Sequence, residues 1–186
     1  MSRWTTRVDF RMFVSFSYRA DSLSDMRAAL SDLSLQLSIA ALRRIARAAA
    51  ADPDLVDQVP VDEHERTWLR LHVAPGVAAW AIRWPAGTST GWHDHIGEQG
   101  PVRGAFVVVD GLLLESSWSG TGAVRRRLGP GGVRSFGPSY VHDVTSIGDH
   151  AALSVHVYSP ELTAMRTYST DTGELRLIGI GPLDEW

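Results

Sequence analysis

Hydrophobic residues recur at spacings of three and four along residues 22–51, which is the period of one face of a helix. Ser22 and Asp25 resemble a capping box at the start of this segment, and Asp52-Pro53 ends it. The serines between Ser31 and Ser38 compete for backbone hydrogen bonds, so the segment predicts either one helix or two packed helices. The apolar positions are Leu23, Met26, Leu30, Leu33, Leu37, Leu42, Ile45 and Ala49.

From Arg66 onward the pattern changes to short β-rich runs separated by Gly and Pro turns. The runs include RTWLRLHV, VAAWAIRW, GAFVVV, LLLESSW and ALSVHVYSP, and the turns include APG, PAG, DG and SGTG. Many short strands at regular spacing predict a β-sandwich or barrel rather than alternating βαβ units. We therefore expect a single domain over residues 1–186, with a helical section over about 1–60 and an all-β core over about 61–186.

The composition agrees with one soluble domain. A chain of 186 residues can bury one core, and 44% hydrophobic with 21% charged residues fits neither a disordered nor a membrane protein. Eighteen Lys and Arg against 21 Asp and Glu give a net charge of −3, so nucleic acid is not an expected partner. Charged residues interrupt the apolar positions near the N-terminus, so we expect no signal peptide, no membrane contact and a cytoplasmic location.

Cysteine is absent, which excludes disulfides, thiolate metal ligands and a cysteine nucleophile. Any metal must therefore be bound through nitrogen and oxygen. Among seven histidines, His93 and His95 flank one residue, and such neighbours share a face of a strand, so both can bind one cation. His142, which follows the turn GPS, is placed to supply a third imidazole. Each of the three can instead be an ordinary core histidine, and no chemistry is expected of His64, His72 and His150.

A second group of polar residues alternates with valines in Ser154-Val155-His156-Val157-Tyr158. One face of this strand carries a hydroxyl, an imidazole and a phenol. We interpret the row as a hydrogen-bonded relay in which Ser154 sets the tautomer of His156 and His156 orients Tyr158. An amphipathic strand with its polar face in water is the alternative, because alternation alone does not tell an interior from an exterior face.

Together these motifs resemble the cysteine dioxygenase family of cupins, which are mononuclear non-haem iron thiol dioxygenases. The resemblance covers roughly residues 66–168. It rests on W-L-R at 68–70, PAGTSTGWHDH at 85–95, GAFVVVDG at 104–111, YVHDV at 140–144 and SVHVYSP at 154–160. It implies a cupin fold, that is, a small β-barrel of the jelly-roll type.

The resemblance also implies which residues form the site. His93, His95 and His142 correspond to the ligands of Fe(2+). Three neutral imidazoles leave the metal its full charge and open positions for thiolate, amine and dioxygen. Ser154, His156 and Tyr158 correspond to the catalytic relay. Arg70 falls at the position of the arginine that holds the substrate carboxylate, while Arg66 and Arg83 are nearby alternatives.

The sequence departs from the family pattern at several positions. Gly104 stands where many cupins have a carboxylate ligand, which predicts a three-histidine site. Without cysteine, Tyr158 cannot form the thioether cross-link of some family members. The loop over 96–103 brings Glu98 near the site, either as a solvated residue or as a fourth ligand. Trp68 replaces the tyrosine commonly found two places before the arginine.

We therefore expect an Fe(II)-dependent thiol dioxygenase that converts a small aminothiol to its sulfinate, with L-cysteine as the favoured substrate. Its partners would be the small-molecule thiol and O2, and a monomer is favoured. A dioxygenase for another thiol such as 3-mercaptopropionate is the first alternative. A cupin that only binds a ligand or a metal is the second.

Overall fold

The computed structural model describes residues 36–73, 76–97 and 100–182 of the chain. Within this part the helices are α2 (Ile39–Ala50) and α3 (Leu55–Gln58). The strands of the first sheet are β1 (Thr67–Arg70), β2 (Ala78–Trp84), β5 (Arg103–Asp110), β8 (Val133–Phe136) and β10 (Ala152–Ser159). Those of the second are β3 (Trp92–Gly97), β4 (Gly100–Pro101), β6 (Leu113–Trp118), β7 (Ala123–Leu128), β9 (His142–Ser146), β11 (Leu162–Ser169) and β12 (Arg176–Pro182).

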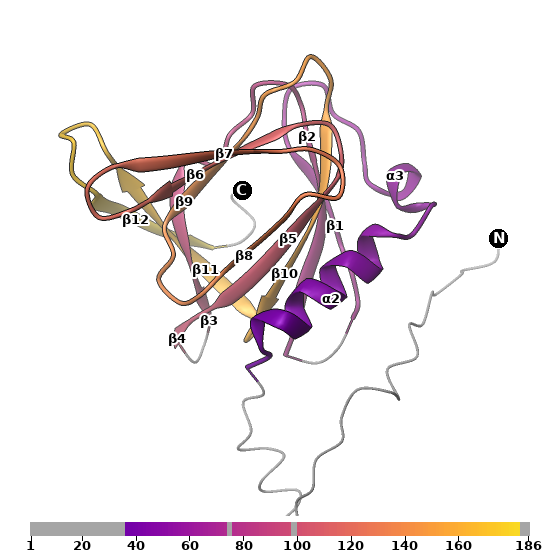
Figure 1. The fold of residues 1–186 in the computed structure, drawn as a ribbon, viewed down its shortest axis with the longest axis horizontal. Helices are drawn as coiled ribbons and strands as arrows, with labels where there is room; N and C mark the ends of the chain where they lie inside the picture. The colour runs from indigo at the N-terminus through magenta and orange to yellow at the C-terminus, as the bar shows by residue number, and fades with distance from the viewer. Residues whose placement is uncertain (1–35, 74–75, 98–99, 183–186) are drawn as a thin grey trace, which may run out of the picture. The chain divides into compact units, whose positions relative to one another are not determined.

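Both sheets consist of antiparallel strands whose order differs from their order in the chain (Figure 1). The first sheet runs β1-β2-β10-β5-β8, and the second runs β12-β11-β3-β9-β6-β7 with β4 beside β3. Strands from distant parts of the chain therefore lie next to each other. This confirms the predicted fold class in its architecture, an all-β core of two antiparallel sheets preceded by helices. That residues 1–186 form a single domain stays a prediction.

Within the described part of the predicted helical segment, α2 begins at Ile39, directly after Ser38. This residue has an extended backbone, with φ −65° and ψ 151°, and its hydroxyl accepts a hydrogen bond from the Ala41 N–H at 3.2 Å. It therefore caps α2, because its side chain satisfies an N–H that has no partner within the first turn. The helix ends before Asp52-Pro53, as the pattern predicts. The expected cap at Ser22 and the rest of residues 22–35 lie outside the described residues.

An apolar core fills the space between the two sheets. Large side chains of β2, β5, β8 and β10 meet those of β6, β9 and β11 there. Alternation along each strand explains this, since every second residue faces inward. The fully or almost fully buried members include Ile82, Trp84, Phe106, Leu113, Phe136, Val144, Tyr158 and Leu162.

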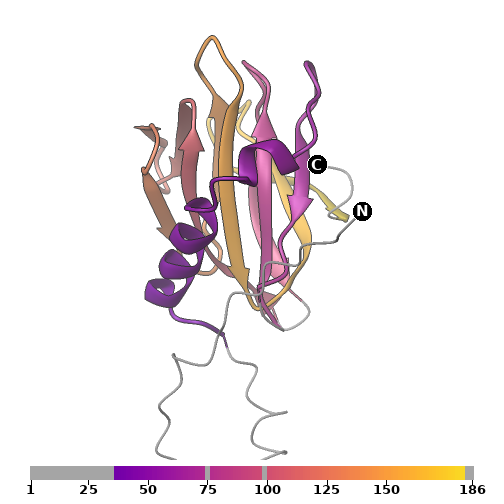
Figure 2. The ribbon, with the colours of Figure 1, turned by 90° about the vertical axis from the view of Figure 1, so that its right-hand side faces the viewer.

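A second core lies on the outer face of the first sheet, where α2 packs against β5, β8 and β10. Figure 2 shows the helix crossing the strands on this side. Leu42 and Ala46 of α2 are completely buried, and they pack with Val155 and Val157 of β10. Burial of one such valine or leucine contributes about 1.5–3 kcal/mol, so the helix holds β10 firmly in place.

Strand β10 is consequently buried along its whole length. It pairs with β2 on one side and β5 on the other, its valines lie under the helix, and its polar residues face the interior between the sheets. The alternative of a polar face in water is therefore wrong for Ser154, His156 and Tyr158, whose exposed fractions are 0%, 3% and 1%.

The turn between β5 and β6 contains Asp110-Gly111, which agrees with the turn expected at DG. Gly111 has φ +74°, a conformation that side chains disfavour, and a Cβ there would lie 2.6 Å from the Cα of Ala152. Only glycine fits this position. Across the described residues, no helix is both long and apolar enough to span a membrane. The cytoplasmic location stays a prediction.

Candidate metal centre

Strand β3 presents His93 and His95 to the interior, as their spacing predicts. Asp94 between them points to the opposite face, where it is 1% exposed and accepts hydrogen bonds from Arg166 Nε and Nη2 at 2.8 and 2.6 Å. Tyr168 donates a further hydrogen bond to Asp94 at 3.1 Å. Both partners lie on the neighbouring strand β11. This buried ion pair stabilises the orientation of β3, because turning Asp94 inward would leave its charge unpaired.

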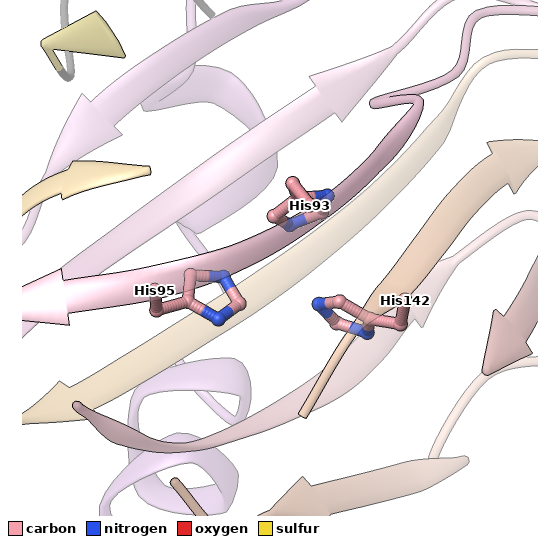
Figure 3. A group of neighbouring side chains, drawn as sticks. All are labelled: His93, His95 and His142. Carbon is pink, nitrogen blue, oxygen red and sulfur yellow. The ribbon is translucent and has the colours of Figure 1, made fainter. Parts of the chain in front are cut away.

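His142 completes the group from a strand that is distant in the sequence. It is the first residue of β9 and pairs directly with His93 in the sheet register. Ligand nitrogens of His93, His95 and His142 all lie within 4.8 Å of one another, and the three side chains are 1–2% exposed. Figure 3 shows the rings converging on one point. The structure thus brings together all three histidines that the sequence predicts as metal ligands.

In His93 and His142, hydrogen bonds determine which ring nitrogen is available to bind a metal. His93 Nδ1 lies 2.9 Å from the carbonyl oxygen of Gly91, and His142 Nδ1 lies 3.2 Å from Glu115 Oε1. Both partners can only accept, so Nδ1 carries the proton and Nε2 keeps a lone pair. Burial, together with the neighbouring imidazoles, holds the pKa of both His93 and His95 well below the usual value. The rings of His93 and His95 are therefore neutral, as metal ligands must be.

Two buried nitrogens in this group have no hydrogen-bond partner within the described part of the chain. They are the Nε2 atoms of His95 and His142. A buried polar atom without a partner is costly, and coordination to a cation would satisfy both. A set of three neutral imidazole nitrogens fits a divalent first-row metal such as iron or zinc.

The space where a fourth ligand would come from strand β5 is filled. A Cβ added to Gly104 would lie 2.3 Å from the ring of Phe136 and 3.0 Å from that of Tyr158. Phe136 in turn stacks on His95, with ring centroids 5.1 Å apart and an interplanar angle of 14°. The three-histidine prediction agrees with this packing. Glu98, the other candidate ligand, lies outside the described residues.

The polar row on β10 forms the chain of contacts that the sequence predicts. Ser154 Oγ lies 2.9 Å from His156 Nε2, and His156 Nδ1 lies 3.2 Å from the Tyr158 hydroxyl. Burial lowers the pKa of His156 to about 3, with smaller effects of the His142 and Arg66 charges in the same direction. His156 is therefore neutral near pH 7, with one donor nitrogen and one acceptor nitrogen.

Trp84, which was not selected from the sequence, adds a donor to the start of this chain and is compatible with one direction of its hydrogen bonds. Its indole N–H donates to Ser154 Oγ at 2.8 Å. The Ser154 proton is then satisfied if it is donated to His156 Nε2, which leaves His156 Nδ1–H to donate to the Tyr158 oxygen. In this arrangement the row does not use the Tyr158 proton, and the centre of the Tyr158 ring lies 4.7 Å from that of His95. Burial raises the pKa of Tyr158, so the hydroxyl stays protonated.

The three candidate arginines lie in different surroundings. Arg70 forms an ion pair with Glu161, and its side chain is 55% exposed. Arg83 donates from Nη2 to the carbonyl oxygen of Val56 at 2.5 Å. Arg66 has its guanidinium 5.4 Å from the centre of the Trp84 ring and makes no hydrogen bond or ion pair with another described residue. The role of Arg70 in holding a substrate carboxylate stays a prediction.

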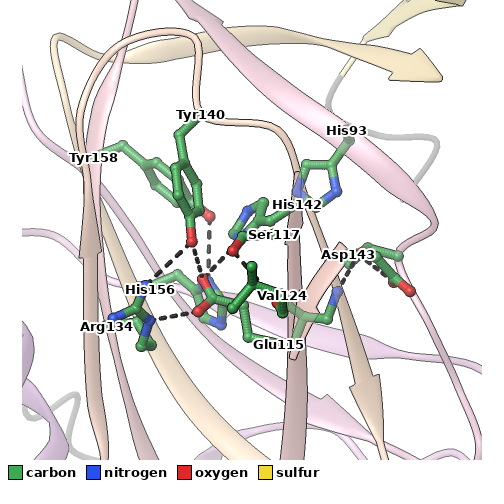
Figure 4. Close-up of polar contacts among 12 residues, drawn as sticks. His93, Glu115, Ser117, Val124, Arg134, Tyr140, His142, Asp143, His156 and Tyr158 are labelled. Carbon is green, nitrogen blue, oxygen red and sulfur yellow. Dashed lines mark hydrogen bonds and ion pairs between the residues drawn. The ribbon is translucent and has the colours of Figure 1, made fainter. Parts of the chain in front are cut away.

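A buried carboxylate next to the cluster, that of Glu115, was not predicted from the sequence. Glu115 on β6 is 1% exposed and accepts hydrogen bonds from His142 at 3.2 Å, from the Tyr140 hydroxyl at 3.3 Å and from Arg134 Nε (Figure 4). Burial opposes ionisation, but the contacts with His142 and Arg134 hold the pKa of Glu115 below its usual value. A single acidic residue within the apolar run LLLESSW was the signal that could have drawn attention to it.

Comparison with known proteins gives a family match over most of the chain. The model of the family described as cysteine dioxygenase type I matches residues 12–171. No curated protein matches significantly.

Several solved structures resemble the fold at low sequence identity. The cupin domain of Cnp3 from Schizosaccharomyces pombe is 15% identical, with a TM-score of 0.47 over 57% of this chain and 72% of that one. A conserved protein with a double-stranded β-helix domain from Klebsiella pneumoniae is 14% identical, with a TM-score of 0.49 over 67% and 94%. A sugar phosphate isomerase of the cupin superfamily from Silicibacter pomeroyi is 16% identical, with a TM-score of 0.47 over 69% and 91%.

Removing one ligand should abolish tight metal binding. His142→Ala takes away one of three nitrogens, so we expect its metal content after loading with Fe2+ and desalting to fall far below that of the native protein. The exposed His150→Ala variant is the control and should keep native metal content. Metal analysis of the desalted proteins checks this. Full occupancy in His142→Ala would show that the metal binds elsewhere.

The buried relay should make the stability of the metal-free protein depend on pH. His156 has a pKa of about 3 in the folded chain against an ordinary value of 6.5, so between these pH values the unfolded chain binds a proton that the folded chain does not. The free energy of unfolding should therefore fall as the pH is lowered from 6.5 towards 3, by at most about 1.4 kcal/mol per pH unit for this group. Buried His93 and His95 act in the same direction.

Urea unfolding at several pH values between 7 and about 4 measures this dependence. His156→Gln should lower the slope of unfolding free energy against pH, whereas the exposed His150→Gln should keep the native slope. An unchanged slope in His156→Gln would mean that other groups take up the proton.

Proposed function

Because the chain belongs to the cysteine dioxygenase type I family, we propose that it is an Fe(II)-dependent thiol dioxygenase with L-cysteine as its favoured substrate. The reaction adds both oxygen atoms of O2 to the thiol sulfur, so that a thiol and O2 give a sulfinate and a proton. The observation that carries the proposal is the cluster of His93, His95 and His142 next to the row that ends in Tyr158.

The metal would be held by the Nε2 atoms of the three histidines. Burial lowers the pKa of His93 and His95 and so keeps these two rings neutral, and hydrogen bonds at Nδ1 orient His93 and His142. The Nε2 atoms of His95 and His142 have no other partner within the described ranges. Fe2+ bound there would supply open positions at which a thiolate and O2 react together. The residues prepare these positions in advance, because the rings come from strands that are fixed in a packed barrel.

Tyr158 would act as a hydrogen-bond donor to the reactants. Its proton is the last in the row that starts at Trp84, and its raised pKa keeps that proton in place. A donor held in position in a buried site favours the charge that develops on oxygen or sulfur during the reaction. Binding of a metal or a ligand alone requires no such row. This feature supports an enzyme over a cupin that only binds.

A carboxylate on the substrate would need a cation, since an unpaired charge in a buried site is costly. The family resemblance assigns this role to Arg70, which would have to exchange Glu161 for the substrate. Arg66 is the other candidate, because it lies over Trp84 and its charge contributes, after burial and His142, to the lowered pKa of both His93 and His156.

The test of the proposal is sulfinate formation by the iron-loaded protein. We expect L-cysteine to be converted with one O2 consumed for each sulfinate formed. Faster turnover of 3-mercaptopropionate, which has no amine, would show that this thiol and not L-cysteine is the preferred substrate. Tight iron binding without sulfinate from any small thiol would favour the binding cupin.

Tyr158→Phe should separate catalysis from metal binding in the same assay. The variant keeps the ring and loses only the hydroxyl, so we expect native iron content with slower turnover or with less sulfinate formed for each O2 consumed. Tyr168→Phe is the matched control, because its hydroxyl contacts Asp94 on the other face of β3. Equal rate and yield for native protein and Tyr158→Phe would show that the row is structural.

The arginines can be distinguished with two thiols. Arg70→Gln should raise the KM for L-cysteine about 10- to 100-fold, since a charge-assisted hydrogen bond is worth about 1.5–3 kcal/mol. Cysteamine, which has no carboxylate, should be almost unaffected if it is used at all. If only Arg66→Gln raises the KM for L-cysteine and leaves cysteamine unaffected, Arg66 holds the carboxylate instead. Arg83→Gln is the control, because Arg83 donates to the carbonyl oxygen of Val56. If Arg70→Gln impairs turnover of L-cysteine and of cysteamine equally, Arg70 supports the folded structure and does not bind the carboxylate.

A further inference from the structure

The three imidazoles of the cluster are held by different kinds of partner. His93 donates to a backbone carbonyl, that of Gly91. His95 stacks on Phe136, and its ring makes no hydrogen bond with any residue that the structure describes. His142 alone has a charged partner, the carboxylate of Glu115. The environment of His142 is therefore the one in which a single side chain can change both the orientation and the donor strength of the ring.

Glu115 is itself fixed from three sides (Figure 4). Oε2 accepts from Arg134 Nε, while Oε1 accepts from the Tyr140 hydroxyl at 3.3 Å and from His142 at 3.2 Å. Arg134 Nη2 also donates to the Tyr140 oxygen at 3.1 Å, and the Tyr140 ring packs edge-on against that of His142. The carboxylate therefore has little freedom to move away from the imidazole.

The sheet register places these groups together. Glu115 on β6 lies opposite Val144 of β9, and Ser117 lies opposite His142, so Glu115 and His142 sit on paired neighbouring strands. A carboxylate behind a metal-binding histidine fixes its tautomer and increases the basicity of its free nitrogen. Both effects strengthen the bond to a cation without any contact between the carboxylate and the cation.

We propose that Glu115 is a positioning residue that sets the metal affinity of the site through His142. The proposal rests on the proposed use of the three histidines as metal ligands. Glu115 keeps the His142 proton on Nδ1 and directs Nε2 to the point shared with His93 and His95. Its charge offsets part of the charge that a divalent metal brings into the buried site. Arg134 and Tyr140 hold Glu115 in the orientation that this requires.

The protein contains a matched control for this arrangement. Asp94 is equally buried, with 1% exposure, and is paired with Arg166 and Tyr168 as Glu115 is with Arg134 and Tyr140. It forms no hydrogen bond to an imidazole, because it faces away from the interior. Asp94→Asn therefore removes a comparable buried charge without removing the partner of a ligand. Its amide keeps the size of the side chain and an oxygen that can still accept from Arg166, so β3 keeps its orientation.

The experiment measures metal affinity, not turnover. Metal-free native protein, Glu115→Gln and Asp94→Asn are titrated anaerobically with Fe2+ against a chromogenic chelator, and with Co2+ followed by its absorption spectrum. We expect Glu115→Gln to bind both metals about 10- to 100-fold more weakly than the native protein. Asp94→Asn should keep near-native affinity even though its melting temperature falls. A change in the Co2+ spectrum of Glu115→Gln would report the altered His142 ligand directly.

Each other outcome has a distinct meaning. Native affinity in Glu115→Gln, or an equal loss in Asp94→Asn, would overturn the role of Glu115. Should Glu115→Gln fail to fold, Glu115→Asp keeps the charge but shortens its reach, and unchanged affinity in that variant would overturn the role as well. If the native protein binds neither metal, the proposed metal site fails instead.

Discussion

Three imidazoles meet inside the barrel with ligand nitrogens within 4.8 Å of one another, in a buried place where a positive charge on a ring is costly. Burial lowers the pKa of His93 and His95 and keeps these rings neutral. The Nε2 atoms of His95 and His142 have no partner among the described residues, and a divalent cation is a partner that suits them. The neighbouring residues hold the three rings in place. Gly91 and Glu115 hold two of the rings through Nδ1, and Phe136 both supports the third and fills the space beside Gly104.

The site is rigid because its strands are fixed on their other faces. Val155 and Val157 of β10 are held under α2, and Asp94 of β3 is held by Arg166. Alternation along a strand then directs the residues between these anchors to the interior. Side chains outside the site thus determine the direction of those within it, which is how a scaffold of strands holds reactive groups more accurately than loops do.

The polar row on β10 distinguishes this interior from a simple metal-binding pocket. Trp84 can only donate, and a row in which Ser154 donates to His156 and His156 donates to Tyr158 does not use the Tyr158 proton. Each group in the row is buried, so an incorrectly directed hydrogen bond would be costly. The chain belongs to the cysteine dioxygenase type I family, and the role of Tyr158 as a donor to the reactants is part of the function proposed for it.

Local spacing in the sequence determined that His93 and His95 share a face, that Ser154, His156 and Tyr158 share another, and that glycine turns separate short strands. These patterns depend only on the geometry of a single strand, so they can be predicted before the fold is known. The tertiary structure alone decided that both polar faces point inward, that His142 pairs with His93, and that α2 begins after Ser38. It also revealed Glu115 and Trp84 as partners of the site. Those features depend on which strands pair, in which register, and on which face a helix covers, and such long-range contacts leave no periodic signal in the chain.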